Sequence, residues 1–351
     1  MKALTLFIVL SFRVSADTVS LDLKIEEGSA TEIAISANTG NGDRGDVTYS
    51  GNLLGDLVFD PVTLAVESFS FTGGRVNFSD NVLTFTSLVL FDPDGIKASL
   101  NTRFTQTTTG TSATFSTLNS PGSIVSGNEL LNEEHEAIFD QGSFTIAVMV
   151  ADTEPQSDVV DFEENPETGP IGGTYHIAME ETSHNLYGRT FKVTLSQTIN
   201  SSDTLAYEDT NAVLTFTEVG SIPAVASFSH PTRYGAWLLK NGLGNSPPET
   251  LNPHGLAYGL LFALDLPAAA ASVPLTIQKS DIGLTANLPF PENGLPVSVR
   301  IEQQSLLTPA LTWETLQSYP PGTTGPISVE LTDQPVNFLR VVAALPTSET
   351  P

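Results

Sequence analysis

The sequence VSLDLKI, residues 19–25, alternates apolar and polar side chains at every position. The same alternation recurs in residues 69–71, 82–86, 144–148, 191–195 and 213–217. Successive side chains of a strand point to opposite faces, so short alternating runs rich in Val, Phe, Thr and Ile indicate strands with one buried face. Residues 17–228 are therefore predicted to be β-structure.

Turn-forming residues separate these segments. Clusters of Gly, Pro, Asn and Asp occur at residues 38–46, 60–61, 73–74, 92–95, 120–122 and 169–173. Many short strands with closely spaced turns favour an antiparallel β-sandwich or barrel. Residues 129–137 are the one stretch of this region predicted to be helical.

The pattern changes at Pro231. Residues 233–242 and 256–266 are predicted to form two short helices. In the second segment, leucines lie three and four positions apart, which is the spacing of one helix face. Strand-like segments follow at residues 275–277, 284–286, 297–301, 312–316, 327–331 and 337–342. The expected architecture is mainly β: a β-sandwich or barrel over 17–228, then a short helical hairpin and a small antiparallel β domain over 229–345, and a tail over 346–351.

The first 16 residues have the form of a secretory signal peptide. Lys2 precedes an apolar run over residues 3–12, and the segment closes on Val14-Ser15-Ala16. We expect cleavage after Ala16 and a secreted or cell-envelope location in a bacterium; the alternative is a buried N-terminal strand. No later stretch approaches the ~18 apolar residues that a membrane span needs, so no span is predicted.

The charge of the chain limits its partners. Forty acidic residues against 14 basic ones give a formal charge of −26. Nucleic acid and anionic lipid are bound through Lys and Arg, so neither is an expected partner, whereas glycans and other envelope components are compatible with this charge. The chain has no cysteine, which excludes disulfides and thiolate chemistry.

Four elements of the C-terminal third occur in a recognisable order. They are YGAW at residues 234–237, GLAYGLLFAL at 255–264, TPALTW at 308–313 and NFLRV at 337–341. This order resembles the C-terminal module of exported proteins from planctomycete and verrucomicrobial type bacteria. The resemblance implies an exported or surface-associated protein without a named catalytic activity, and a small core built on Trp237, Phe262 and Trp313.

One part of that module is degenerate here. The proteins that this segment resembles carry an Asp-x-Asp-Gly-Asp-Gly loop, which is similar to a calcium loop because alternating carboxylates supply hard oxygen ligands. This sequence has LNPHG at residues 251–255, where Asn252 offers a single amide oxygen. We therefore expect no calcium at this loop.

Acidic and histidine-containing segments are the remaining candidates for chemistry. Asp92-Pro93-Asp94-Gly95, with Asp80 nearby, has the composition of either a weak calcium site or an ordinary turn, and the turn is favoured because Asp and Gly are typical turn residues. Residues 132–136 and 176–184 hold three of the five histidines without metal-binding regularity. Strand alternation places His176 and Glu180 on a solvent face, and the acidic run 158–164 is interpreted in the same way. No cofactor is expected.

Two short motifs are non-specific. Arg44-Gly45-Asp46 is an integrin-binding tripeptide in a predicted loop, but a three-residue match is frequent by chance. The sequons at Asn77 and Asn200 matter only if the export route glycosylates.

The leading hypothesis is an exported acidic β-protein with a structural, adhesive or ligand-binding role and no catalysis. One alternative is a glycan-active lyase or hydrolase on a β-sandwich, which a cluster of Tyr175, His176 and Arg189 would favour. A second alternative is a calcium-dependent matrix-binding protein. A concave sheet face holding two carboxylates would also favour the enzyme, whereas a flat or convex polar surface would favour a binding or structural role.

Overall fold

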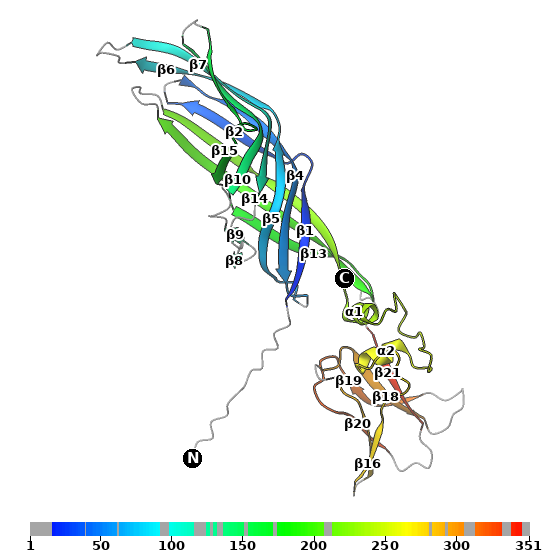
Figure 1. The fold of residues 1–351 in the computed structure, drawn as a ribbon. Helices are drawn as coiled ribbons and strands as arrows, with labels where there is room; N and C mark the ends of the chain where they lie inside the picture. Colours follow the sequence, from blue (N-terminus) through cyan, green and yellow to red (C-terminus); the bar gives the residue numbers. More distant parts are fainter. Residues whose placement is uncertain are drawn as a thin grey trace, which may run out of the picture. The chain divides into compact units, whose positions relative to one another are not determined.

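A computed structural model describes residues 16–38, 40–61, 63–91, 98–115, 124–126, 129–131, 136–150, 154–170, 174–206, 213–280, 283–291, 294–304, 313–331 and 338–345. These residues are mainly β-strand and include two short helices (Figure 1). The expected signal peptide up to Ser15, the turn at 92–95 and the tail at 346–351 lie outside the described residues. None of the helices in the described ranges has the length and apolar character to cross a membrane.

The chain divides into two compact units. The first unit contains residues up to 180 and residues 192–228, and the second contains residues 181–191 and 229–351. The chain therefore passes between the units three times, at 180/181, 191/192 and 228/229. The sequence-based boundary at 229 coincides with the last of these crossings, whereas the first two lie within the predicted β domain.

Fifteen antiparallel strands build the large sheet. They are β1 (Asp17–Ile25), β2 (Ala30–Ala37), β3 (Gly40–Asn41), β4 (Asp43–Phe59), β5 (Val66–Phe78), β6 (Asn81–Phe91), β7 (Ala98–Phe115), β8 (Ile124–Ser126), β9 (Glu129–Leu131), β10 (Glu136–Val150), β11 (Gln156–Asp161), β12 (Glu167–Pro170), β13 (Thr174–His184), β14 (Gly188–Ala206) and β15 (Val213–Pro231). The main order is β11-β10-β7-β5-β4-β1-β15-β14-β13-β9-β8. The predicted antiparallel, mainly β architecture is confirmed.

Four of these strands close on themselves. Strand β1 pairs with β4, β4 with β2, β2 with β15, and β15 with β1, which makes a four-stranded barrel within the sheet. Closure removes the free edges that an open sheet would leave unpaired.

The alternation in β1 explains which side is buried. Leu21, Leu23 and Ile25 are buried while the residues between them are exposed. They join an apolar core that includes Leu57 and Phe69, both fully buried. The burial of these apolar side chains in one core is the dominant favourable term in the folding of this unit.

Three local predictions are wrong. The described part of residues 129–137 is strand and not helix, because Glu129–Leu131 form β9 and β10 begins at Glu136. Gly73 and Gly74 do not end a strand but lie inside β5, where their positive φ angles accompany a register shift beside Leu54. Glycine in a strand interior often marks such a bulge.

The Arg44-Gly45-Asp46 motif is the third of these errors. It lies in β4 and pairs with β2, so it is part of a ladder and not of a loop. The composition of Asn38 to Asp46 is typical of a turn, yet most of these residues belong to the paired strands β3 and β4. The polar composition reflects the exposed side of a strand.

The second unit combines two helices with two three-stranded antiparallel sheets. Its elements after β15 are α1 (Arg233–Lys240), α2 (Tyr258–Ala263), β16 (Thr276–Ser280), β17 (Gly283–Leu288), β18 (Ser298–Gln304), β19 (Glu314–Tyr319), β20 (Ile327–Leu331) and β21 (Phe338–Ala344). The sheets run β16-β17-β20 and β19-β18-β21. The predicted helical hairpin and small β domain are thus confirmed, with helices shorter than the patterns indicated.

Helix α1 packs directly on the turn between β13 and β14. Thr232 caps the helix by accepting from the Gly235 amide at 3.0 Å, and its hydroxyl donates to the Leu186 carbonyl at 2.6 Å. A Cβ on Gly235 would lie 1.8 Å from the Tyr187 carbonyl oxygen. Only glycine therefore permits this contact within the second unit.

The core of the second unit differs in part from the prediction. Phe262 is buried, as expected, and Trp237 packs against the core with its ring centroid 6.0 Å from that of Phe262. Tyr234, which the prediction omitted, is the more deeply buried aromatic at 2% exposure. Trp313 is only half-buried and lies beneath the Arg340 guanidinium, 4.4 Å from its ring centroid.

Candidate functional site

A sheet face rich in hydroxyl groups runs across four strands of the first unit. Its members face the same way because they are opposite one another in the register of β6, β7, β10 and β11. We call it the hydroxyl face; it comprises Thr84 and Thr86 of β6, Thr105, Thr107 and Thr109 of β7, Ser143 and Thr145 of β10, and Ser157 of β11. These strands are labelled in Figure 1, apart from β11.

Alternation along the strands accounts for the orientation of the hydroxyl face. Leu83, Phe85 and Phe104 point to the opposite side and are buried at 2%, 3% and 5% exposure. The Phe85 and Phe104 rings stack there with centroids 4.8 Å apart. Thr84 and Thr105, which are cross-strand neighbours, are therefore turned away from that core.

The hydroxyl face is nearly free of charge. Its central row runs from Val82 through Thr107 and Thr145 to Val159, and the two valines are 59% and 55% exposed. Charged side chains in these rows are confined to Arg103 and to residue Asp161 at the opposite end. In a chain of net charge −26, this combination of hydroxyls and methyls is distinctive.

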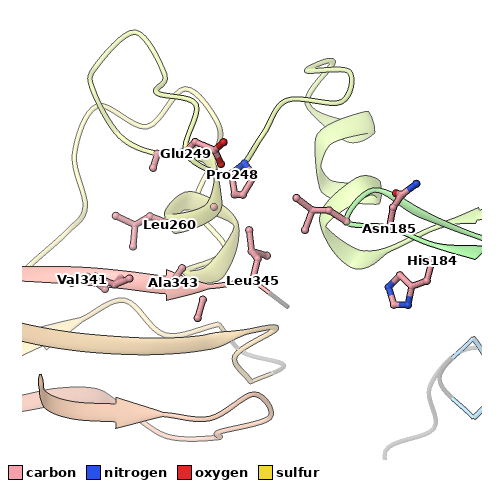
Figure 2. Close-up of a pocket in the computed structure, with 13 residues that line it drawn as sticks. His184, Asn185, Pro248, Glu249, Leu260, Val341, Ala343 and Leu345 are labelled. Carbon is pink, nitrogen blue, oxygen red and sulfur yellow. The ribbon is translucent and has the colours of Figure 1, made fainter. Parts of the chain in front are cut away.

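The second unit contains a pocket of about 680 Å³. Figure 2 shows it between the turn that carries His184 and Asn185 and the segments that carry Leu260 and Leu345. Residues 341–345, at the end of β21, line it consecutively, and Pro248 and Glu249 stand at its rim. Its size is in the ~300–1,000 Å³ range of small-molecule sites, which are mostly apolar with a few placed polar groups.

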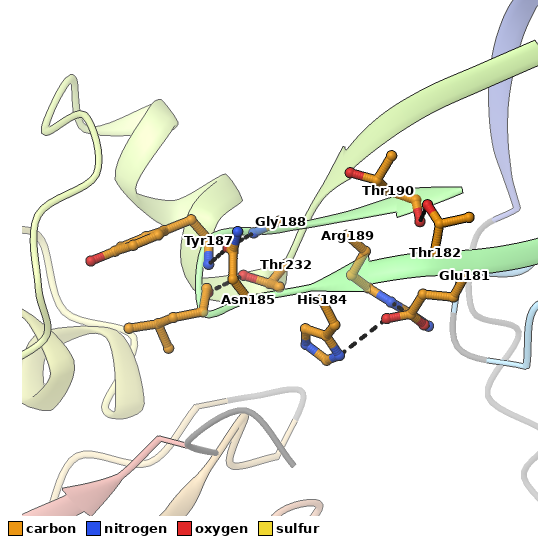
Figure 3. Close-up of polar contacts among 10 residues, drawn as sticks. Glu181, Thr182, His184, Asn185, Tyr187, Gly188, Arg189, Thr190 and Thr232 are labelled. Atoms are coloured by element: carbon orange, nitrogen blue, oxygen red, sulfur yellow. Dashed lines mark hydrogen bonds and ion pairs between the residues drawn. The ribbon is translucent and has the colours of Figure 1, made fainter. Parts of the chain in front are cut away.

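A charged cluster lies beside this pocket (Figure 3). Glu181 accepts from Nε of Arg189 at 3.0 Å and also from a terminal nitrogen of that guanidinium, and its other oxygen is 3.2 Å from His184 Nδ1. The hydrogen bond from Arg189 holds the pKa of the Glu181 carboxyl below its usual value. A carboxylate that an ion pair keeps deprotonated is a poor general base. The cluster is therefore suited to stabilising the turn.

The turn itself is fixed by an amide side chain. Asn185 Oδ1 accepts from the backbone N–H groups of Tyr187 and Gly188 at 2.8 and 3.0 Å. The Asn185 N–H donates to the Gly188 carbonyl at 2.9 Å. This is the local pattern by which Asn stabilises tight turns, and it presents His184 to the pocket.

Tyr175, His176 and Arg189 do not form the cluster that would have indicated an enzyme. Tyr175 is fully buried against Phe71, and burial raises its pKa. His176 points to the opposite, exposed side of β13, and Arg189 is bound to Glu181.

The other acidic candidates have local structural roles where they are described. Asp80 accepts from the Gly110 amide at 2.8 Å, and Asp161 accepts from the Glu163 amide at 2.9 Å. Residues 92–95 and 132–135 lie outside the described ranges. Within those ranges, no group of three or more His, Asp and Glu side chains has the arrangement to hold a metal ion.

Asn252 organises the loop at residues 251–255. It is 4% exposed; its amide nitrogen donates to the carbonyls of Ala268 and Ala270 at 3.0 and 2.8 Å. Its oxygen accepts from the amides of His254 and Leu256 at 2.9 Å each. All four hydrogen-bonding positions of the amide are thus used within the protein.

Sequence reasoning missed a partly buried cluster of three polar side chains. Thr31, Tyr49 and Glu218 come from three strands of the four-stranded barrel, and the Tyr49 hydroxyl donates to Glu218 at 2.5 Å. Thr31 also donates to Glu218, at 2.8 Å. Burial and the Glu218 carboxylate raise the pKa of Tyr49, so its phenol stays protonated and the trio satisfies itself internally. The contact spans 187 residues, which no local pattern signals.

Comparison of the chain with protein-family models, with curated proteins and with solved structures found no match.

Proposed function

We propose that this protein is an exported, non-catalytic binding protein of the bacterial envelope or extracellular space, and that the hydroxyl face attaches it to a neutral polysaccharide. The observation that carries the proposal is this face: eight Thr and Ser side chains on four paired strands, with charge only at its margin. Hydroxyl groups both donate and accept, so they can exchange hydrogen bonds with sugar hydroxyls in either direction.

Charge supports a neutral partner over an anionic one. A polymer of acidic sugars would be repelled by a chain of net charge −26. A neutral glycan would contact hydroxyl and methyl groups, and no charged group would have to lose its water. The exposed Val82 and Val159 at the two ends of the central row add apolar contact area.

Export rests on the sequence of residues 1–16. N-terminal sequencing of the native protein is expected to begin at Asp17, where β1 also begins. A native protein that retains Met1 to Phe12 after export contradicts this part of the proposal.

Retention on insoluble cellulose and chitin tests the binding role. The full chain should be retained, and the double variant Thr107→Glu/Thr145→Glu should lose at least tenfold of its affinity, because it places two carboxylates in the centre of the hydroxyl face. The matched control is Thr48→Glu/Ser50→Glu, which makes the same charge change on exposed positions of β4. Equal loss in both double variants, or no retention of the unmodified protein on either polymer, refutes the proposal.

A further inference from the structure

Two hollows of the second unit are adjacent to each other. The pocket of about 680 Å³ and a second hollow of about 190 Å³ share Leu260 and Val341 as lining residues. The second hollow lies between the two small sheets, since its lining includes Ala286 of β17 and Ile301 of β18. The side chains of Leu260 and Val341 therefore lie between the two hollows.

The side chains around the second hollow are all apolar. All nine residues that line it have aliphatic side chains. Well-packed interiors contain few voids larger than a water molecule, and an apolar cavity of roughly 150 Å³ stays dry and accepts apolar guests. The aliphatic lining of the hollow therefore favours contact with a hydrocarbon group over contact with water.

The rim of the larger pocket is polar and acidic. Glu249 lies there, and among the described residues no salt bridge to Glu249 is formed and no Lys or Arg lines the pocket. Arg189, close to the rim residue His184, is held by Glu181. A positively charged group at the rim would be attracted, and a carboxylate or phosphate would be repelled.

From these three observations we infer that the second unit binds a linear apolar chain with a cationic amine head group. The hydrocarbon chain extends past Leu260 into the hollow beside Ala286, and the amine lies at the rim beside Glu249. This site is separate from the hydroxyl face, and neither proposal depends on the other.

The inference predicts a dependence on chain length. Each additional methylene buried in the hollow should tighten binding about fourfold until the hollow is full. The experiment uses the full protein and the neutral fluorescent probe N-phenyl-1-naphthylamine, displaced by octyl-, decyl- and dodecylammonium and by dodecanoate, all below their micelle concentrations. Dodecylammonium should displace the probe at a concentration at least tenfold lower than dodecanoate.

Three variants separate the parts of the site. Glu249→Gln should abolish most of the preference for the amine over the carboxylate, whereas Glu330→Gln, an exposed residue outside both hollows, should leave it unchanged. Ala286→Leu adds carbon atoms where the hollow lies, so it should remove the gain from octyl to dodecyl chains while the protein stays folded. Ala343→Leu fills the larger pocket instead and should weaken all the amines.

Several results would overturn the inference. Failure of the probe or of dodecylammonium to bind, equal displacement by dodecanoate, or an unchanged amine preference in Glu249→Gln would each do so. Unfolding of Ala286→Leu would show that no hollow exists at that position, and retained chain-length dependence in that variant would show that the chain does not enter it.

Discussion

The two units of this protein are stabilised in different ways. The first unit obtains its core from strand alternation repeated over fifteen paired strands, so its burial is spread over many interchangeable apolar side chains. The second unit depends on a few irreplaceable contacts, such as Gly235 against the Tyr187 carbonyl and Asn252 at the centre of its loop. Single substitutions should therefore have small effects on exposed strands of the first unit and large effects in the second.

Tryptophan fluorescence gives a selective readout for this comparison. The chain has two tryptophans, Trp237 and Trp313, and both belong to the second unit. Far-ultraviolet circular dichroism instead reports mainly the strands of the first unit. Each variant below can thus be assigned to one unit.

The largest effect is expected for Gly235→Ala. In an ordinary helix this change would be favourable by about 1 kcal/mol, but here the new Cβ would lie 1.8 Å from a backbone oxygen. We expect a loss of about 4 kcal/mol, enough to unfold the second unit by fluorescence. Gly188→Ala is the control, because its Cβ would have an ordinary contact at 3.4 Å. A stable Gly235→Ala protein would mean that α1 does not rest on the turn.

Trp237→Ala should be the next most damaging change. Trp237 packs with Tyr234 and Phe262 at centroid distances of 6.1 and 6.0 Å, and truncation of a core aromatic costs about 3 kcal/mol. Trp313→Ala should cost only about 1 kcal/mol, since its ring is half-buried and its contact is a cation–π pair with Arg340. Urea denaturation followed by the remaining tryptophan measures both. Equal losses would place Trp313 in the core after all.

Asn252→Ala should cost about 2–3 kcal/mol, because buried carbonyls of Ala268 and Ala270 would lose their donors. Asn252→Asp keeps the acceptor but removes the donors, so it should destabilise the second unit as well. The exposed Asn245→Ala should be nearly neutral. If Asn252→Asp were as stable as the unmodified protein, the amide nitrogen would have no role in the loop.

The Glu181 cluster should give a smaller, pH-dependent effect. The hydrogen bond from Arg189 lowers the folded-state pKa of the Glu181 carboxyl from 4.5. The contribution of this carboxylate to stability is therefore present above that pH and is lost as the pH falls below it. Glu181→Gln should flatten the decline in melting temperature of the second unit below about pH 4.5. An identical decline in both proteins would assign acid unfolding to other carboxylates.

Thr145→Val in the first unit should change stability by less than about 0.5 kcal/mol, because the side chain lies on the hydroxyl face and both residues favour strands. Circular dichroism during thermal unfolding measures this. A large loss would contradict the comparison, since it would make a half-buried strand position outside the core of the first unit as sensitive as the second unit.

Sequence reasoning was most effective where a local period determined structure. The alternation in residues 19–25 predicts the buried side of β1 correctly, and the leucine spacing near Leu260 locates α2. It failed where composition resembled a turn, because Gly73 and Gly74 lie at a bulge inside β5 and Asp46 lies on the exposed side of β4. Turn composition and an exposed strand face cannot be distinguished without knowledge of the pairing.

Sites were harder to predict than strands. The hydroxyl face requires the register of four strands, which brings Thr84 and Ser157 into one row although 73 positions separate them. The partners of Glu181 are closer to it in sequence, since Arg189 and His184 are on the same hairpin. Their geometry nevertheless depends on the turn at Asn185. Tyr234 was missed as a core residue because Trp237 is the larger and more conspicuous member of the same motif.

The turn at residues 181–191 has a consequence for biosynthesis. It belongs to the second unit, yet the ribosome makes it more than 40 residues before α1, which begins at Arg233. The Tyr187 carbonyl can therefore contact Thr232 and Gly235 only after those residues have been synthesised. The second unit cannot complete its folding earlier. By the same reasoning, a gene fragment that begins at residue 229 does not encode the whole second unit, because it would leave α1 without the surface on which it rests.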